Sequence, residues 1–289
     1  MTYDQSALEA LSASERKLAE SLLIERVSSE RDCIAMVTLG ELGSVRAVEV
    51  LQQAAQEDDV EVRSAALRSL VAIKKDPDHV RQLGELLKTS SGAVSDAFVA
   101  YQLANSASPQ AIEGLLEGLD AGFLPARIHS WDGLEAQLKL PDELLNPHQT
   151  PIRVAVSQTL TPFPLVIREG AERLREIVRG LLAGQTPEAL GLIYESRDAP
   201  ELLERVWEGF RSVHPAYDID AISQLTGHNR AWVRVHLLFR LGQRDIRAAR
   251  AIEALGWNDM KPQMEDAYEE LKHLSRLRGE LREILSRMG

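Results

Sequence analysis

The chain has 289 residues, with 33 Lys and Arg against 44 Asp and Glu, which gives a formal net charge of -11. Proteins that bind nucleic-acid phosphates normally present a basic surface, so this charge disfavours a general polyanion-binding function, although a local basic groove stays open. The single cysteine, Cys33, provides neither an intrachain disulfide nor a cysteine-based zinc site.

Several functional classes lack their sequence motifs. The chain has no GxGxxG or GxxxxGK[ST] nucleotide loop, no GxSxG and no HExxH. We therefore predict no catalytic residue, no cofactor and no metal. No apolar run approaches the ~18 to 20 residues of a membrane span, and the first residues lack the basic and apolar segments of a secretory signal. These features favour a cytoplasmic protein.

In chain order, residues 1–29 predict an N-terminal capping helix, and a repeated pattern follows. An anchor residue is followed seven positions later by leucine. The five pairs are Asp32–Leu39, Arg63–Leu70, Asp96–Leu103, Arg153–Leu160 and Arg234–Leu241. The positions before the anchor, three after it and seven after it share one helix face, so each copy presents an apolar stripe. Many of the stripe residues are small, which favours close helix packing.

A second apolar helix follows each of the early repeat helices. The three partner segments are "SVRAVEVLQQAAQ", "DPDHVRQLGELLKT" and "SPQAIEGLLEGLD". The Asp and Pro residues at their starts suit N-caps and first turns. A helix pair of about 30 to 45 residues that recurs along a chain is typical of an α-solenoid.

The segments "DDVEVRSAALRSL" and "NRAWVRVHLLFRL" resemble HEAT repeats of the short bacterial form. The resemblance covers roughly residues 30–120, 150–180 and 225–245. Asp32 and Asp96 depart from it, since Arg is usual at these anchors. The resemblance implies an all-α fold of stacked antiparallel helix pairs and says little about function.

We predict one elongated solenoid over residues 1–289, divided by its pattern into five segments. They are the capping helix 1–29, regular repeats 30–120, an irregular insertion 121–149, degenerate repeats 150–245 and C-terminal capping helices 246–289. Residues 186–198 and 199–215 are expected to be degenerate repeats, and residues 261–289 a long terminal helix.

The insertion is the first candidate for a binding site. It contains Phe123, His129 and Trp131 and three prolines, which exclude one continuous helix over its length. Insertions in solenoids commonly project as loops from one face, and that face often binds partners. The alternative is that Phe123 and Trp131 fold back to cover a degenerate repeat.

The second candidate lies in "HNRAWVRVHLLFRLG". Trp232 and His236 are four residues apart and share a helix face, while His228 and Arg230 precede them near a helix N-terminus that favours anions. The alternative is structural: Trp232 packs on the C-terminal helices, and His236 makes an interhelix hydrogen bond.

A third candidate is the segment 205–220, where Trp207, Phe210, Arg211 and His214 recur at helical spacing. Aromatic residues and Arg are typical of protein-binding hot spots. A Trp and a Phe at this spacing are also typical of a helix that faces the core.

The favoured function is a non-catalytic scaffold or adaptor that binds another protein. Residues 1–120 hold 20 Asp and Glu but 11 Lys and Arg, which favours a partner with a basic or helical segment, and 11 of the 14 aromatic residues follow this region. Two alternatives stay open. The Trp-Val-Arg helix start is similar to that of HEAT-like alkylpurine DNA glycosylases, and the regular repeats resemble those of HEAT-like phycobilin lyases.

Overall fold

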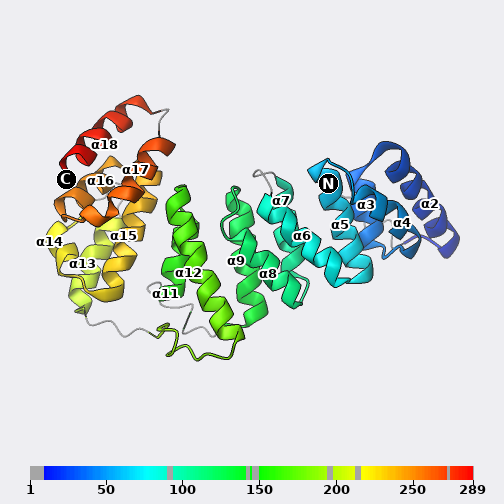
Figure 1. Cartoon of the computed structure of the whole chain (residues 1–289), viewed down its shortest axis with the longest axis horizontal. Coiled ribbons are helices and arrows are strands. Elements are labelled where there is room, and N and C mark those ends of the chain that lie inside the picture. Colours follow the sequence, from blue (N-terminus) through cyan, green and yellow to red (C-terminus); the bar gives the residue numbers. More distant parts are fainter. Residues whose placement is uncertain are drawn as a thin grey trace. The chain divides into compact units, whose positions relative to one another are not determined.

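The structure is a computed structural model that describes residues 10–89, 94–140, 144, 150–193, 198–211, 216–271 and 274–288. In this part of the chain the regular secondary structure is helical, and helices pack on helices throughout (Figure 1). The prediction of an all-α fold built from stacked helices is confirmed. The chain forms two compact units, Met1–Lys139 and Leu140–Gly289. The boundary between them falls inside the segment 121–149, and the five segment boundaries stay a prediction.

The first unit is a succession of helices in two layers (Figure 1). Its elements are α2 (Ala13–Glu30), α3 (Cys33–Glu41), η1 (Val45–Ala47), α4 (Val48–Ala54), α5 (Val60–Lys74), α6 (Pro77–Thr89), α7 (Val94–Ala104), α8 (Pro109–Gly118) and α9 (Leu124–Leu138). One layer contains α3, α5, α7 and α9, and α6 packs on α8 in the other. Helix α2 packs on α3 and α4 at the start of the unit.

Polar side chains at helix starts explain where several of these helices begin. The Asp59 carboxylate accepts hydrogen bonds from the backbone N–H groups of Glu61 and Val62, at 2.8 and 3.2 Å, and α5 follows. Asp32 does the same for α3. Asp32 is therefore an N-cap outside the helix and not the equivalent of Arg63 within α5, which explains the departure from Arg at this position.

Small residues bring neighbouring helices close together, as the repeat pattern predicts. A Cβ atom placed on Gly40 would lie 2.7 Å from the Ser69 Cα, and one on Gly133 would lie 2.7 Å from the Ala104 Cβ. In the second layer a Cβ on Gly84 would lie 2.8 Å from the Gly114 Cα. These separations are too short for any side chain, so the spacing between helices depends on these glycines.

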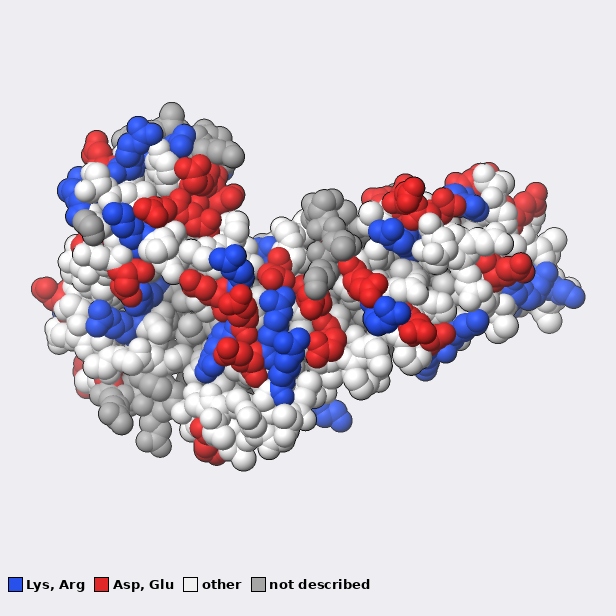
Figure 2. Space-filling view, viewed as in Figure 1, with Lys and Arg blue, Asp and Glu red and all other residues white. Residues whose placement is uncertain are grey.

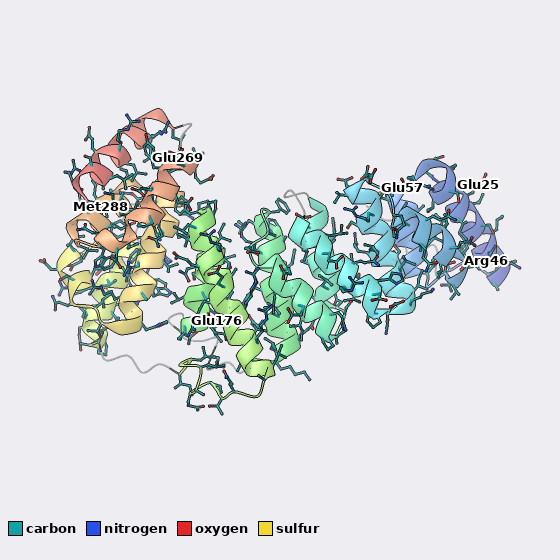
Figure 3. The ribbon with its side chains drawn as sticks, viewed as in Figure 1. Glu25, Arg46, Glu57, Glu176, Glu269 and Met288 are labelled. Carbon is teal, nitrogen blue, oxygen red and sulfur yellow. The ribbon has the colours of Figure 1, made fainter. Side chains whose placement is uncertain are left out.

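Polar contacts also join α2 to the helices that follow it. Arg46, labelled in Figure 3, donates to the Lys17 carbonyl at 3.3 Å and to the Ser21 hydroxyl at 3.2 Å on α2. Arg31 just after α2 pairs with Glu57 at 2.8 Å. Because these side chains are partly exposed, we expect each pair to add little stability.

The expectation that the segment 121–149 projects as a loop is wrong for residues 124–138, which form α9. Pro125 is tolerated because it lies in the first turn of α9, where its missing N–H has no intrahelical partner. Helix α9 packs extensively on α7 and thereby continues the first layer. Residues 141–143 and 145–149, including Pro141 and Pro147, lie outside the described part of the chain.

Most helices of the second unit, shown in Figure 1, contribute to a hydrophobic core formed by residues between Phe163 and Met288. Its elements are α11 (Pro151–Thr159), α12 (Pro164–Leu182), α13 (Pro200–Arg211), α14 (Ile219–Gln224), α15 (Gly227–Gly242), α16 (Ile246–Ala254), η2 (Asn258–Met260), α17 (Lys261–Glu270) and α18 (Ser275–Arg287). Phe163, Val206, Leu237 and Trp257 belong to its core. Met288, labelled in Figure 3, closes the same core after the last helix.

Two predictions for this unit are wrong. Residues 187–191 form turns instead of a repeat helix, because Gly184 and Gly191 adopt positive φ angles of 80° and 64° that end helical geometry. The long terminal helix is divided into α17 and α18. Leu271 is buried at the division, and this break lets both helices direct apolar residues into the core.

Candidate functional site

Two residues of the second candidate, Trp232 and His236, form a ring stack on α15. The rings of Trp232 and His236 are nearly parallel, with centroids 4.3 Å apart and an interplanar angle of 14°. Their shared helix face, predicted from the spacing of four, is confirmed. Both side chains are half-buried.

This stack packs on α13. The Trp207 and Trp232 ring centroids are 3.7 Å apart, and the Phe210 and His236 centroids are 5.0 Å apart in an edge-on arrangement. Trp232 therefore contacts α13, an element that the structural alternative did not name, and packs against the core of the second unit. His236 makes ring contacts, and no hydrogen bond of its side chain occurs in the described residues. Burial, aided by the nearby Arg240 charge, lowers the pKa of His236 to about 4.

His228 and Arg230 lie in the first turn of α15. The Arg230 guanidinium lies 5.3 Å from the centroid of the buried Trp257 ring, and that of Arg234 lies 5.6 Å from it. Arg234 also forms an ion pair with Asp259. These arginines bind the C-terminal part of the unit to α15. Burial lowers the pKa of His228 to about 4, so His228 is neutral near pH 7.

The third candidate divides between the core and the surface. Trp207 and Phe210 face the core of the second unit. Arg211 is exposed and pairs with Glu204 at 3.0 Å. His214 lies outside the described residues.

In the first unit, Trp131 is 4% exposed and belongs to the core between helices. Its indole N–H is shielded from solvent and has no hydrogen-bond partner in the described residues. Phe123 is half-buried at the N-cap of α9. These two positions agree with the alternative in which the aromatics of this segment pack back on the repeats.

His129 lies instead on a row of exposed and half-buried side chains across three helices of the first layer. Its ring centroid is 6.5 Å from that of Tyr101 on α7, at an angle of 77°. Tyr101 is 58% exposed, and Phe98, one turn earlier on α7, is 48% exposed. The Arg68 guanidinium of α5 lies 5.0 Å from the Phe98 ring centroid. We refer to Arg68, Phe98, Tyr101 and His129 as the aromatic strip.

Arg68 is the polar member of the strip. Its Nε atom is shielded from solvent and has no hydrogen-bond partner, and its guanidinium makes no ion pair with the described part of the chain. Burial lowers the pKa of Arg68, and the opposing effect of the Glu41 charge is smaller. Arg68 stays a cation. It is stabilised by the Phe98 ring and, through charge alone, by the Glu41 carboxylate, which lies beyond ion-pair distance.

Acidic side chains border the strip. Glu61 lies two turns before Arg68 on the same face of α5, and Asp132 lies three residues after His129 on α9. Both are exposed, as is Glu41 at the end of α3. The strip therefore combines an apolar aromatic centre, one cation and an acidic border.

Of the four strip residues, His129 is among the candidates predicted from the sequence, whereas Arg68, Phe98 and Tyr101 are not. The repeat pattern carries a signal that could have found two of them. Phe98 and Tyr101 stand two and five positions after the anchor Asp96, outside the apolar stripe. Positions outside the inner stripe are the ones at which large rings can be exposed.

Other site types find little support in the described residues. No group of three His, Cys, Asp or Glu side chains lies close enough there to hold a metal ion. None of the described helices is long and apolar enough to traverse a bilayer. On the face that Figure 2 shows, Lys and Arg side chains are interspersed with Asp and Glu and form no broad basic surface.

The helix pairs of the first unit define an α-solenoid. Residues 20–100 match the family model for HEAT repeats, a match that runs from α2 into α7. This part of the chain is therefore built of HEAT repeats. HEAT repeats in general mediate interactions between proteins. No significant match was found among curated proteins or among solved structures.

Proposed function

We propose that the protein is a non-catalytic scaffold or adaptor that binds a partner protein through the aromatic strip. The observation that carries this proposal is the exposure of Phe98 and Tyr101 side by side on α7. Large aromatic side chains next to an arginine have the composition of protein-binding hot spots, in which desolvated rings contribute most of the affinity.

The repeat architecture supports the same function. The glycine and alanine contacts between α7 and α9 hold the backbone under the strip in place, so Tyr101 and His129 are presented by rigid helices. A surface on rigid helices loses little conformational entropy when a partner binds. The charged border favours a partner segment with basic residues on either side of its apolar anchors, because Glu41, Glu61 and Asp132 would attract them.

The test uses the full chain with a photo-crosslinking amino acid in place of Tyr101, expressed in its native cells. A partner identified by mass spectrometry would then be purified, and its affinity measured by calorimetry. Phe98→Ala and Tyr101→Ala should each weaken binding by tenfold or more, as expected of roughly 1.4 kcal/mol per hot-spot ring.

Leu182→Ala is the matched control, because Leu182 is a similarly exposed apolar residue in the second unit. It should leave the affinity unchanged. A partner whose affinity is insensitive to both α7 substitutions would show that the strip is not the binding surface.

A further inference from the structure

Arg68 is an incomplete interaction site in the free protein. Its guanidinium contacts the Phe98 ring on one side, whereas no carboxylate, carbonyl or hydroxyl of the described residues accepts a hydrogen bond from it. A guanidinium has five N–H donors in a planar fork, and leaving donors unpaired in a partly desolvated place is costly. This geometry lacks a hydrogen-bond acceptor for the Arg68 guanidinium, and a charged acceptor would bind the guanidinium most strongly.

The packing of the helices explains why none of the described residues of the first unit fills this role. Helices α5 and α7 contact each other less extensively than α3 and α5 or α7 and α9 do. Arg68 reaches across this looser junction to Phe98. Glu41 is near enough to act on Arg68 through its charge, but it forms no ion pair with it.

We propose that the partner protein places one Asp or Glu carboxylate against the Arg68 guanidinium, next to an apolar side chain that covers Phe98 and Tyr101. The inference rests on the proposed function and specifies the chemistry of the partner. The recognised segment then has a single acidic residue beside its apolar anchor, and the basic residues that flank them face Glu41, Glu61 and Asp132.

The acidic border selects among anions. A polyanion such as a nucleic-acid strand would bring several negative charges close to Glu61 and Asp132 as well as to Arg68, and like charges repel. One carboxylate enclosed between apolar groups and flanked by basic residues avoids this repulsion. The planar fork of the guanidinium also matches the two oxygens of a carboxylate in a bidentate arrangement.

The experiment selects a random 16-residue peptide display library on the immobilised full chain, with the Phe98→Ala, Tyr101→Ala double variant as the counter-selection. We expect the enriched peptides to contain Asp or Glu within one helical turn of a large apolar residue. Selection on Arg68→Glu should replace that acidic residue with Lys or Arg.

A double-mutant cycle gives the quantitative test. The tightest peptide and its Asp→Asn or Glu→Gln form are measured by fluorescence anisotropy against the native chain and Arg68→Met. Losing either charge should weaken binding by roughly tenfold, and losing both should weaken it little more. Glu61→Gln, on the same face of α5, is the control and should leave the effect of the peptide substitution unchanged. Circular dichroism on each variant verifies that it is folded.

The outcomes separate the two proposals. Peptides that depend on Phe98 and Tyr101 but show no acidic preference and no coupling to Arg68 would overturn this inference and leave the proposed function standing. If no enriched peptide depends on Phe98 and Tyr101, peptide binding at the strip is refuted, and the proposed function fails together with the inference.

Discussion

The two units place their aromatic side chains in opposite environments. In the first unit Phe98 and Tyr101 are about half exposed on α7, whereas in the second unit Phe210 and Trp257 are almost completely buried. The first unit has few aromatic residues and yet exposes these two on its surface. The second has many and uses them to fill its core. The abundance of aromatic residues in a segment therefore does not show where its binding surface lies.

The cause is the size of the residues between the helices. In the first unit, contacts such as Gly133 with Ala104 and Gly84 with Gly114 leave no room for a ring at these points. Phe98 and Tyr101 remain half exposed, whereas Trp131 is buried. In the second unit, Trp207 and Trp232 lie between α13 and α15, and their rings fill the space between these helices.

The substitution with the largest expected effect removes Trp131, an aromatic residue in the core of the first unit. Trp131→Ala should lower the free energy of unfolding by about 3 to 5 kcal/mol, because it leaves a large cavity beside α7. Urea denaturation followed by circular dichroism measures this change. Trp131→Phe keeps most of the packing and removes the unpartnered N–H, so it should cost less. A loss below about 1 kcal/mol for Trp131→Ala would show that the ring is not a core residue.

Trp232→Ala tests the second unit in the same way. Because Trp232 is half-buried, we expect a smaller loss of about 2 to 3 kcal/mol. The loss should be strongly non-additive with that of Trp207→Ala, since the two rings are in contact. Additive effects in denaturation experiments would contradict the packing between α13 and α15. Binding of a partner at the aromatic strip should be unaffected by either substitution.

Acidification should also destabilise the second unit. The pKa of His236 is about 4 in the folded chain and near 6.5 in the unfolded chain, so the unfolded state binds more protons between these values. Stability is therefore complete above pH 6.5 and declines as the pH falls towards 4. Between pH 7.5 and pH 5, His236 alone should contribute a loss of about 2 kcal/mol.

The measurement is the urea midpoint of the native chain and of His236→Phe at both pH values. The variant keeps an aromatic ring against Phe210 but has no group to protonate, so its midpoint should change less with pH. Equal pH dependence of the two chains would show that His236 is freely protonated in the folded state.

The smallest expected effect on stability belongs to the aromatic strip. Phe98→Ala and Tyr101→Ala should each lower the free energy of unfolding by no more than about 1 kcal/mol, because the rings are half exposed and Phe98 loses one cation–π contact. Thermal and urea denaturation test this directly. A loss as large as that of Trp131→Ala would mean that the rings support the fold, and the contrast between the two units would disappear.

Much of the fold follows from local sequence patterns. Asp59 before an apolar helix predicts the start of α5, and the repeated apolar stripes predict that α3 and α5 pack on each other, although their closest contact, Gly40 with Ser69, lies outside the stripe. These features depend on residues near one another in the chain, so the sequence is sufficient to recognise them. Pro125 does not distinguish a projecting loop from α9, because a proline is equally compatible with a loop and with the first turn of a helix.

The candidate site was harder to predict because burial depends on neighbouring helices. The spacing of Trp232 and His236 correctly predicts a shared face, but it does not reveal that α13 covers that face. The pairing of Arg68 with Phe98 joins residues 30 positions apart on different helices. The repeat pattern predicts that Phe98 points outward, whereas the absence of an acceptor for Arg68 is visible only in three dimensions.

The incomplete contacts of Arg68 imply an evolutionary trade-off. A cation held in a partly desolvated place without an acceptor weakens the free chain, so Arg68→Leu should raise its melting temperature. The same arginine has already lost part of its hydration shell before any partner arrives, which lowers the desolvation cost of association. Selection for thermal stability alone would remove this residue, and selection for recognition would retain it.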